Sequence, residues 1–366
     1  MKKYLVSFSL AVVFLLSLSL AFATDDQGEY KGIRWSFIND TLSFEGEGLI
    51  PSFDTPWNEY YQQTKVLSIG EGIYGLEYWA EFDHMPKLEK IIFATDNFDE
   101  MFVMSEKIKE VVFLGEKPEF KGMDFCYSRL EKILFENAED QYIQEGNFLF
   151  NNDRTELVYY FGSKKEKVVI PDNITTIREG AFANSNIVSI VLPSTLQEIQ
   201  RGAFIRCAKI KTIEIPASCK IIGPSAISSC NSLSKIVFCR ENIELRGYYY
   251  IHGEKIVEGF TFAFNPALKA IELPGCEEIP GSLFMNCSNL KKVVFGEGTK
   301  RIQSGQTFTG CKKLQYIYVP DDMEIDNKFI EGNGDEPPKK AIICCHAGSK
   351  AEELAIKYNL KYKIIK

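Results

Sequence analysis

Short apolar segments with one internal order recur along the middle of the chain. In each, the order is apolar-x-x-apolar-x-apolar, often closed by proline. Positions one, four and six then face one core, while positions three and five point outward. Aliphatic, largely β-branched residues and a closing proline that cannot continue a hydrogen-bond ladder predict a strand of about five residues. The segments are 88–94 (LEKIIFA), 108–114 (IKEVVFL), 130–136 (LEKILFE), 187–193 (IVSIVLP), 210–216 (IKTIEIP), 233–239 (LSKIVFC), 268–274 (LKAIELP), 290–296 (LKKVVFG) and 314–320 (LQYIYVP), with a weaker copy ending at Ile170-Pro171.

The spacing of these segments is that of a repeat protein. Consecutive segments start 20 to 24 residues apart, except at two places where the interval is 35. A period of this length predicts a solenoid in which each rung is one short strand plus a return segment. The long intervals predict insertions near 137–164 and 240–262.

The return segments share a second template, Ile-x-x-Gly-Ala-Phe, seen at 177–182 and 199–204. Glycine permits a tight turn, alanine permits close stacking, and phenylalanine fills the side opposite the strand. One rung cannot bury these faces alone, but stacked rungs bury all of them. The related copies are 222–227, 279–284 and a stretched one at 302–308.

The repeat unit resembles the BspA-type leucine-rich repeats of secreted and surface proteins. The resemblance rests on three motifs taken together: the Ile-Pro strand end, the Ile-x-x-Gly-Ala-Phe turn and the Cys-x-x-Leu that follows it. The resemblance covers about residues 64–320. It implies an α/β or mainly-β solenoid: a right-handed leucine-rich repeat coil with a parallel sheet on one side. It also implies adhesion or contact with other cells.

Both ends of the repeat array also resemble that family. Residues 32–48 read as two alternating strands around Asn39-Asp40, which is a hairpin signal. Residues 341–365 read as strand, helix and strand. We therefore expect an N-terminal β-hairpin cap module at 24–63 and a C-terminal strand–helix–strand cap at 321–366, because the ends of a solenoid core need covering.

The first 23 residues have the pattern of a signal peptide. Lys2 and Lys3 precede an apolar run, and Ala21-Phe22-Ala23 supplies the small-x-small pattern of a cleavage site. We expect cleavage near Ala23 and a secreted or cell-surface protein. The run is short for a membrane anchor, and no later apolar run reaches the length of a transmembrane helix.

Charge and motifs bear on the possible partners. The net charge of −8, from 42 basic and 50 acidic residues, becomes −10 without Lys2 and Lys3 and makes nucleic acid and anionic membranes unlikely partners. No nucleotide-binding, metalloprotease or hydrolase motif is present. No cofactor or metal is expected, and no catalytic residue is assigned.

Ten cysteines would suggest disulfides in a secreted chain. Four of them, however, occupy one repeat position, where a small buried side chain would stack. We favour buried free thiols and keep cross-rung disulfides and, more remotely, a metal site as alternatives. Cys344-Cys345-His346 is the one Cys/His cluster, and strand alternation separates its two thiols.

Two surfaces are candidates for binding. Outward position five is mostly apolar, with Val191, Val237 and Val294, and the array ends with Tyr316 and Tyr318. The alternative is that these side chains pair across strands and are shielded by lysines at position three. The second insertion crowds Tyr248, Tyr249 and Tyr250 together, and insertions of solenoids often lie beside a binding face.

The sequence thus predicts a protein that mediates protein-protein, adhesion-type binding rather than an enzyme. The expected partner is an extracellular protein or glycan, and the expected state is a monomer. The alternatives are a structural component of an extracellular or envelope layer and, secondly, an enzyme of unrecognised type.

Overall fold

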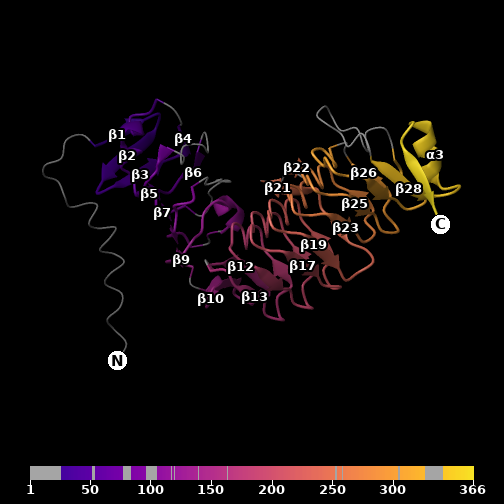
Figure 1. Ribbon diagram of the computed structural model, residues 1–366. Helices are drawn as coiled ribbons and strands as arrows, with labels where there is room; N and C mark the ends of the chain where they lie inside the picture. The colour runs from indigo at the N-terminus through magenta and orange to yellow at the C-terminus, as the bar shows by residue number, and fades with distance from the viewer. Residues whose placement is uncertain are drawn as a thin grey trace.

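The computed structural model shows a long coil that bends into an arc (Figure 1). The expected signal peptide, residues 1–23, lies outside the described part of the chain. Within that part, no helix is long and apolar enough to cross a membrane. The structure describes residues 26–51, 54–76, 84–95, 105–116, 118, 120–138, 140–162, 164–251, 254–257, 259–303, 306–325 and 341–366.

The chain begins with three antiparallel strands, β1 (Gln27–Tyr30), β2 (Ile33–Ile38) and β3 (Thr41–Gly46). The β2–β3 turn places Asn39 and Asp40 at positive φ, 50° and 62°, as a two-residue hairpin turn requires. A short 3₁₀ helix, η1 (Asn58–Tyr60), follows the fully buried Trp57. β4 (Gly48–Ile50) pairs with β6 (Ile73–Leu76).

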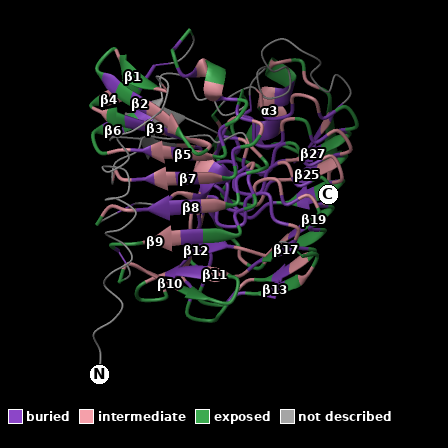
Figure 2. Cartoon of the chain, turned by 90° about the vertical axis from the view of Figure 1, so that its left-hand side faces the viewer, coloured by how far each residue is buried: buried purple, intermediate pink, exposed green. Residues whose placement is uncertain are grey.

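The repeated apolar segments form the expected parallel strands. We call their outward surface the sheet face. β3 pairs in parallel with β5, and the ladder continues through β7 and β8 to β9. Figure 2 shows these strands stacked at left and the later strands at right. The main strands are β5 (Val66–Ile69), β7 (Lys90–Phe93), β8 (Glu110–Phe113), β9 (Lys132–Phe135), β13 (Lys167–Val169), β15 (Ser189–Val191), β17 (Thr212–Ile215), β19 (Lys235–Phe238), β23 (Ala270–Glu272), β25 (Lys292–Val294) and β27 (Tyr316–Tyr318).

Burial within these strands follows the sequence pattern. Position four is buried in every rung, as at Ile91, Ile213 and Val293. Position five is exposed or half-buried in most rungs, and Val112, which is 3% exposed, is an exception. The alternation predicted from the apolar spacing is therefore confirmed, and it fixes which side chains the sheet face presents.

A second ladder of short parallel strands runs along the coil, and the sequence analysis did not predict it. Each of its strands has two residues and ends on the isoleucine or leucine at the start of the return segment. They are β14 (Thr176–Ile177), β16 (Glu198–Ile199), β18 (Ile221–Ile222) and β20 (Glu244–Leu245), and, in a separate pair, β24 (Glu278–Ile279) and β26 (Arg301–Ile302).

The Gly-Ala-Phe motif is the turn and core wedge of each rung. Gly180 and Gly202 have φ of 64° and 58°, in the left-handed region that favours glycine. A Cβ at Gly180 would also lie 2.1 Å from the backbone nitrogen of Met123, in η3 (Gly122–Phe125). The Phe182 and Phe204 rings stack with centroids 5.1 Å apart. One buried cluster continues in this way from Phe150 to Ala355.

The first insertion forms β10 (Tyr142–Glu145), β11 (Phe148–Asn151) and β12 (Glu156–Tyr160), and it divides the interior in two. Leu149 and Val158 belong to the N-terminal core cluster, whereas Phe150 and Leu157 belong to the C-terminal one. Since β12 also pairs in parallel with β14, the insertion starts the second ladder. It is an internal wall of the coil rather than a loop beside it.

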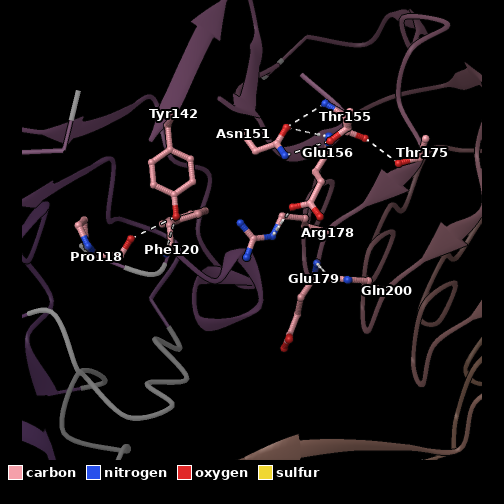
Figure 3. Close-up of polar contacts among 10 residues, drawn as sticks. All are labelled: Pro118, Phe120, Tyr142, Asn151, Thr155, Glu156, Thr175, Arg178, Glu179 and Gln200. Carbon is pink, nitrogen blue, oxygen red and sulfur yellow. Dashed lines mark hydrogen bonds and ion pairs between the residues drawn. The ribbon is translucent and has the colours of Figure 1, made fainter. Parts of the chain in front are cut away.

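Polar contacts fasten this wall to the next rung (Figure 3). Asn151 Oδ1 accepts hydrogen bonds from the backbone nitrogens of Thr155 and Glu156, both at 2.9 Å. Thr175 Oγ1 donates to the Thr155 carbonyl, and Arg178 Nε lies 3.6 Å from Glu156 Oε2. These contacts hold the β11–β12 hairpin in register with β14.

The coil ends with β28 (Ile342–His346), α3 (Lys350–Lys357) and β29 (Tyr362–Ile365). β28 pairs with β27 and β29 pairs with β28, so both extend the sheet of the preceding rungs. Ser349 Oγ caps α3 by accepting a hydrogen bond from the Glu352 nitrogen at 3.1 Å. The strand, helix and strand expected in this region are thus present, while the division of the chain into domains remains a prediction.

Candidate functional site

The residues predicted on the sheet face differ in exposure. Val191 is 43% exposed and Tyr316 is 37% exposed, whereas Val237, Val294 and Tyr318 are half-buried. Val294 and Tyr318 are neighbours in the β25–β27 register. Among the residues predicted on the sheet face, Val191 and Tyr316 are therefore the most accessible.

Exposed apolar side chains gather at β13 and β15. Val169 and Val191 are partners in the strand register, and they are 59% and 43% exposed. Val188, 37% exposed, precedes β15. We call these three residues the valine patch. Position three beside Val191 is Ser189 rather than lysine, whereas Lys167 stands at position three beside Val169, so a lysine flanks the patch on β13 only.

Shielding by lysines, the alternative interpretation of the sequence, holds at the C-terminal end of the sheet face, at β25 and β27. Lys292 Nζ lies 5.1 Å from the centre of the Tyr318 ring and 3.1 Å from Glu272 Oε1. Such a cation over an aromatic face is favourable by roughly 0.5–1 kcal/mol at an exposed site. Tyr318 is thus engaged within the fold, while Tyr316 remains the more accessible tyrosine.

The second insertion forms the antiparallel pair β21 (Tyr248–Ile251) and β22 (Glu254–Val257). Tyr248 is half-buried and lines a cleft, whereas the side chains of Tyr249 and Tyr250 lie outside the described part of the structure, as does His252. The structure therefore places one of the three predicted tyrosines.

The cleft beside Tyr248 has a volume of about 890 Å³ and lies between β20 and β24. Two of its arginines, Arg246 and Arg301, are paired with carboxylates. Arg246 lies 3.1 Å from Glu198 and 3.2 Å from Glu244, and Arg301 pairs with Glu278. Arg240 Nη1 donates to the Cys219 carbonyl at 2.6 Å. The cleft is polar, and sequence reasoning missed it because its residues come from four separate segments.

Comparison with known families identifies the repeat. The model of the BspA type leucine-rich repeat region matches in six copies, over residues 154–258 and 252–333. This chain belongs to the BspA-type leucine-rich repeat family. The predicted family and solenoid fold are therefore confirmed, and such repeat proteins are typically protein-binding scaffolds. No curated protein matches the chain closely enough to count as a relative.

Solved structures similar to this BspA-type chain are bacterial leucine-rich repeat proteins. One from Eubacterium ventriosum is 19% identical with a TM-score of 0.53, covering 84% of this chain and 95% of that one. The pneumococcal vaccine antigen PcpA is 11% identical with a TM-score of 0.45, covering 94% and 100%. A leucine-rich cell surface protein from Faecalibacterium prausnitzii is 16% identical with a TM-score of 0.32, covering 92% and 98%. The first of these supports the fold alone.

The repeated cysteines of this BspA-type chain have a polar role that the sequence analysis missed. Each thiol donates a hydrogen bond to the carbonyl of a phenylalanine in the preceding rung. The pairs are Cys207 with Phe182 at 3.1 Å, Cys230 with Phe204 at 3.1 Å, Cys287 with Phe262 at 3.2 Å and Cys311 with Phe284 at 3.0 Å. The sequence did hold an indication of this role, because serine or asparagine, which also carry a hydrogen-bond donor on a small side chain, fill the same repeat position in other rungs.

Burial keeps most of these thiols protonated. All ten cysteines have free thiols, and Cys239 alone of the ten is exposed. Burial raises the pKa of Cys276 and of Cys287 to about 12. Because the thiolate is the nucleophile and metal ligand, these residues are structural groups rather than reactive ones.

The Cys344-Cys345-His346 cluster does not converge on one point. Cys344 and Cys345 are both buried, whereas His346 is exposed with Nδ1 2.8 Å from Asp321 Oδ1. Among the residues that the structure describes, no group of three His, Cys, Asp or Glu side chains could hold a metal ion.

Proposed function

We propose that this chain is a secreted or cell-surface protein that binds another protein through its sheet face, in an adhesion-type role without catalysis. The observation that carries the proposal is the valine patch, because stacked exposed valines on an open sheet form the kind of contiguous apolar surface that marks protein contacts. Tyr316 offers a second anchor on the same face, since tyrosine is enriched at interface hot spots.

Export and cleavage near Ala23 are part of this proposal, supported by the basic, apolar and small-residue pattern of residues 1–23. The absence of catalysis is a further part of it. The described thiols are mostly buried with raised pKa values, and the cleft carboxylates Glu244 and Glu278 are paired with arginines.

The test is binding of the chain from residue 24 to a panel of extracellular-matrix and cell-surface proteins by biolayer interferometry. Val169→Lys/Val191→Lys should weaken binding at least about tenfold, equivalent to about 1.4 kcal/mol. The matched control Gln197→Lys/Thr195→Lys adds the same charge beside the second ladder and should bind normally. Equal loss in both variants, or in neither, would reject the sheet face as the binding surface.

One observation favours a structural component of an extracellular layer as a second candidate. β29 pairs with β28 and, among the described strands, with no strand on its other side, and it exposes Tyr362 and Ile364. An open apolar edge can pair with another copy. Light scattering over a concentration range tests this: a persistent monomer, which we expect, counts against the layer, and concentration-dependent growth supports it.

A further inference from the structure

The charge of the sheet face changes sharply along the coil. In the five rungs after β15, the six residues from the cysteine position to strand position three contain eight lysines and no acidic residue. The corresponding segments of four earlier rungs mix nine basic residues with five glutamates. The later segments are 207–212, 230–235, 265–270, 287–292 and 311–316, and the earlier ones are 85–90, 105–110, 127–132 and 162–167.

In the earlier rungs, lysines at β7 to β9 form ion pairs with glutamates of neighbouring rungs. Glu110 lies 3.0 Å from Lys90 and 3.4 Å from Lys132, on the strands either side of it. At position two of neighbouring rungs, Lys109 lies 3.6 Å from Glu131. Along β7 to β9, the lysine charges are therefore offset by glutamates.

In the later rungs, exposed lysines stand without acidic partners. Among the described residues, no ion pair is formed by Lys209, Lys211, Lys235, Lys269 or Lys291. Lys313 contacts the neutral Asn289 at 2.7 Å. We call these six residues the lysine ridge. Lys292, beside it, pairs with Glu272.

Backbone contacts place the ridge lysines in neighbouring rungs. The Lys211 carbonyl accepts a hydrogen bond from the Lys235 nitrogen, and the Lys269 carbonyl accepts one from the Lys291 nitrogen. Asn265 joins the two pairs of rungs, because its side chain bonds both Cys230 N and Ile227 O at 2.8 Å. Neighbouring strands lie about 4.8 Å apart, so five rungs give a row of positive charge about 19 Å long.

We propose that the lysine ridge binds a linear anionic glycan, a polysaccharide carrying carboxylates or sulfates, laid across the strands from β17 to β27. The ridge lysines lie at neighbouring positions of successive rungs, and flexible point charges in such a row fit a flexible chain that carries repeated anions. The acidic residues of strands β17 and β23, Glu214 and Glu272, stand at position five and confine an anion to the ridge side.

The surroundings of the ridge favour a glycan over a nucleic acid. Proteins that hold single strands interleave basic residues with aromatic side chains on which bases stack. The outward positions three and five of β17, β19, β23 and β25 carry no aromatic residue, and aromatic side chains, Tyr316 and Tyr318, occur only at the β27 end of the ridge. Duplex DNA would also meet the acidic remainder of a chain with net charge −8.

This inference rests on the proposed extracellular function, because such glycans are met outside cells. Its test uses a heparin octasaccharide, a hyaluronan octasaccharide, neutral dextran and a single-stranded oligonucleotide, each titrated calorimetrically at about 0.05 M and 0.5 M salt. Heparin, hyaluronan or both should bind, more weakly at high salt. Tight dextran binding, or no binding of either anionic glycan at low salt, would overturn the proposal.

The deciding variant is Lys211→Gln/Lys235→Gln/Lys269→Gln/Lys291→Gln, which should bind at least about tenfold more weakly. Its control, Lys87→Gln/Lys109→Gln/Lys350→Gln/Lys363→Gln, removes the same charge from exposed sites elsewhere and should bind within about threefold of the parent. Circular dichroism checks that both variants fold.

Equal losses in both variants would show a general charge effect, and tighter binding of the oligonucleotide through the ridge would replace the glycan by nucleic acid; either result overturns the proposal. If the anionic glycans fail while a protein partner still depends on the valine patch, this inference falls and the proposed function stands.

Discussion

At the residue scale, the return turn sets strict backbone demands. Gly180 and Gly202 share one left-handed position, and a second left-handed position four residues on holds Asn184 and Arg206. The first position lies against the preceding rung, so both conformation and space matter there. The two glycines differ in what a Cβ would meet.

Alanine at these glycines should therefore have unequal effects. Gly180→Ala should lower the free energy of unfolding by at least about 3 kcal/mol, because its Cβ would meet rigid backbone at Met123. Gly202→Ala should cost only about 1–2 kcal/mol, since its Cβ would meet the flexible Met123 side chain. Urea denaturation measures both, and equal losses would show that close packing at Gly180 is unimportant.

Cys239 should be the one thiol that reacts in the folded protein. Desolvation and then the nearby Glu214 carboxylate raise its pKa, with Sγ 3.4 Å from Oε1. Removing a negative charge beside a thiol lowers its pKa and increases the thiolate fraction at a given pH. Glu214→Gln should therefore speed alkylation of Cys239 at pH 8 by about two- to threefold.

Mass spectrometry after iodoacetamide labelling counts the modified cysteines before and after unfolding. One label in the native state and ten after unfolding without reductant are expected. Fewer than ten would reveal disulfides, and an unchanged rate in Glu214→Gln would show that the carboxylate has no influence.

At the element scale, the long-strand ladder was predictable and the second ladder was not. The spacing of Ile187, Ile190 and Leu192 specifies a strand with one buried face, and the structure has that strand. A two-residue strand such as Thr176–Ile177 is too short to show any alternation. The insertion that contains β11 and β12 was predicted from the long repeat interval, but its role as a wall inside the coil required knowing that both of its faces are buried.

The rung after the second insertion depends on Asn265. Its side chain donates to the Ile227 and Phe262 carbonyls and accepts from the Cys230 nitrogen, each at 2.8 Å. Asn265→Ala would leave buried backbone groups unpaired and should cost at least about 2 kcal/mol. Asn265→Cys introduces the residue used in neighbouring rungs and should recover part of that loss.

Urea denaturation of the two Asn265 variants gives the comparison. If alanine and cysteine are equally destabilising, the hydrogen-bonding explanation of this repeat position is wrong.

At the scale of the whole molecule, net charge conceals the distribution that matters. The overall −8 argued against nucleic acid and anionic membranes, yet each rung from β17 to β27 begins with a segment that carries one or two lysines and no acidic residue. That segregation is visible in the sequence only after the rungs have been aligned by their strands. The sequence could not show that the valine patch is more exposed than the other outward residues of the strands, because exposure depends on neighbouring side chains.

The central claim is that partners bind the sheet face rather than the second ladder. The most direct test places a photoreactive benzoylphenylalanine at Val191 or, separately, at the exposed Gln197 beside β16, and cross-links each variant to a protein bound in the panel. We predict cross-linking from position 191 and none from position 197. Cross-linking from position 197 alone, or equally from both, would contradict the account.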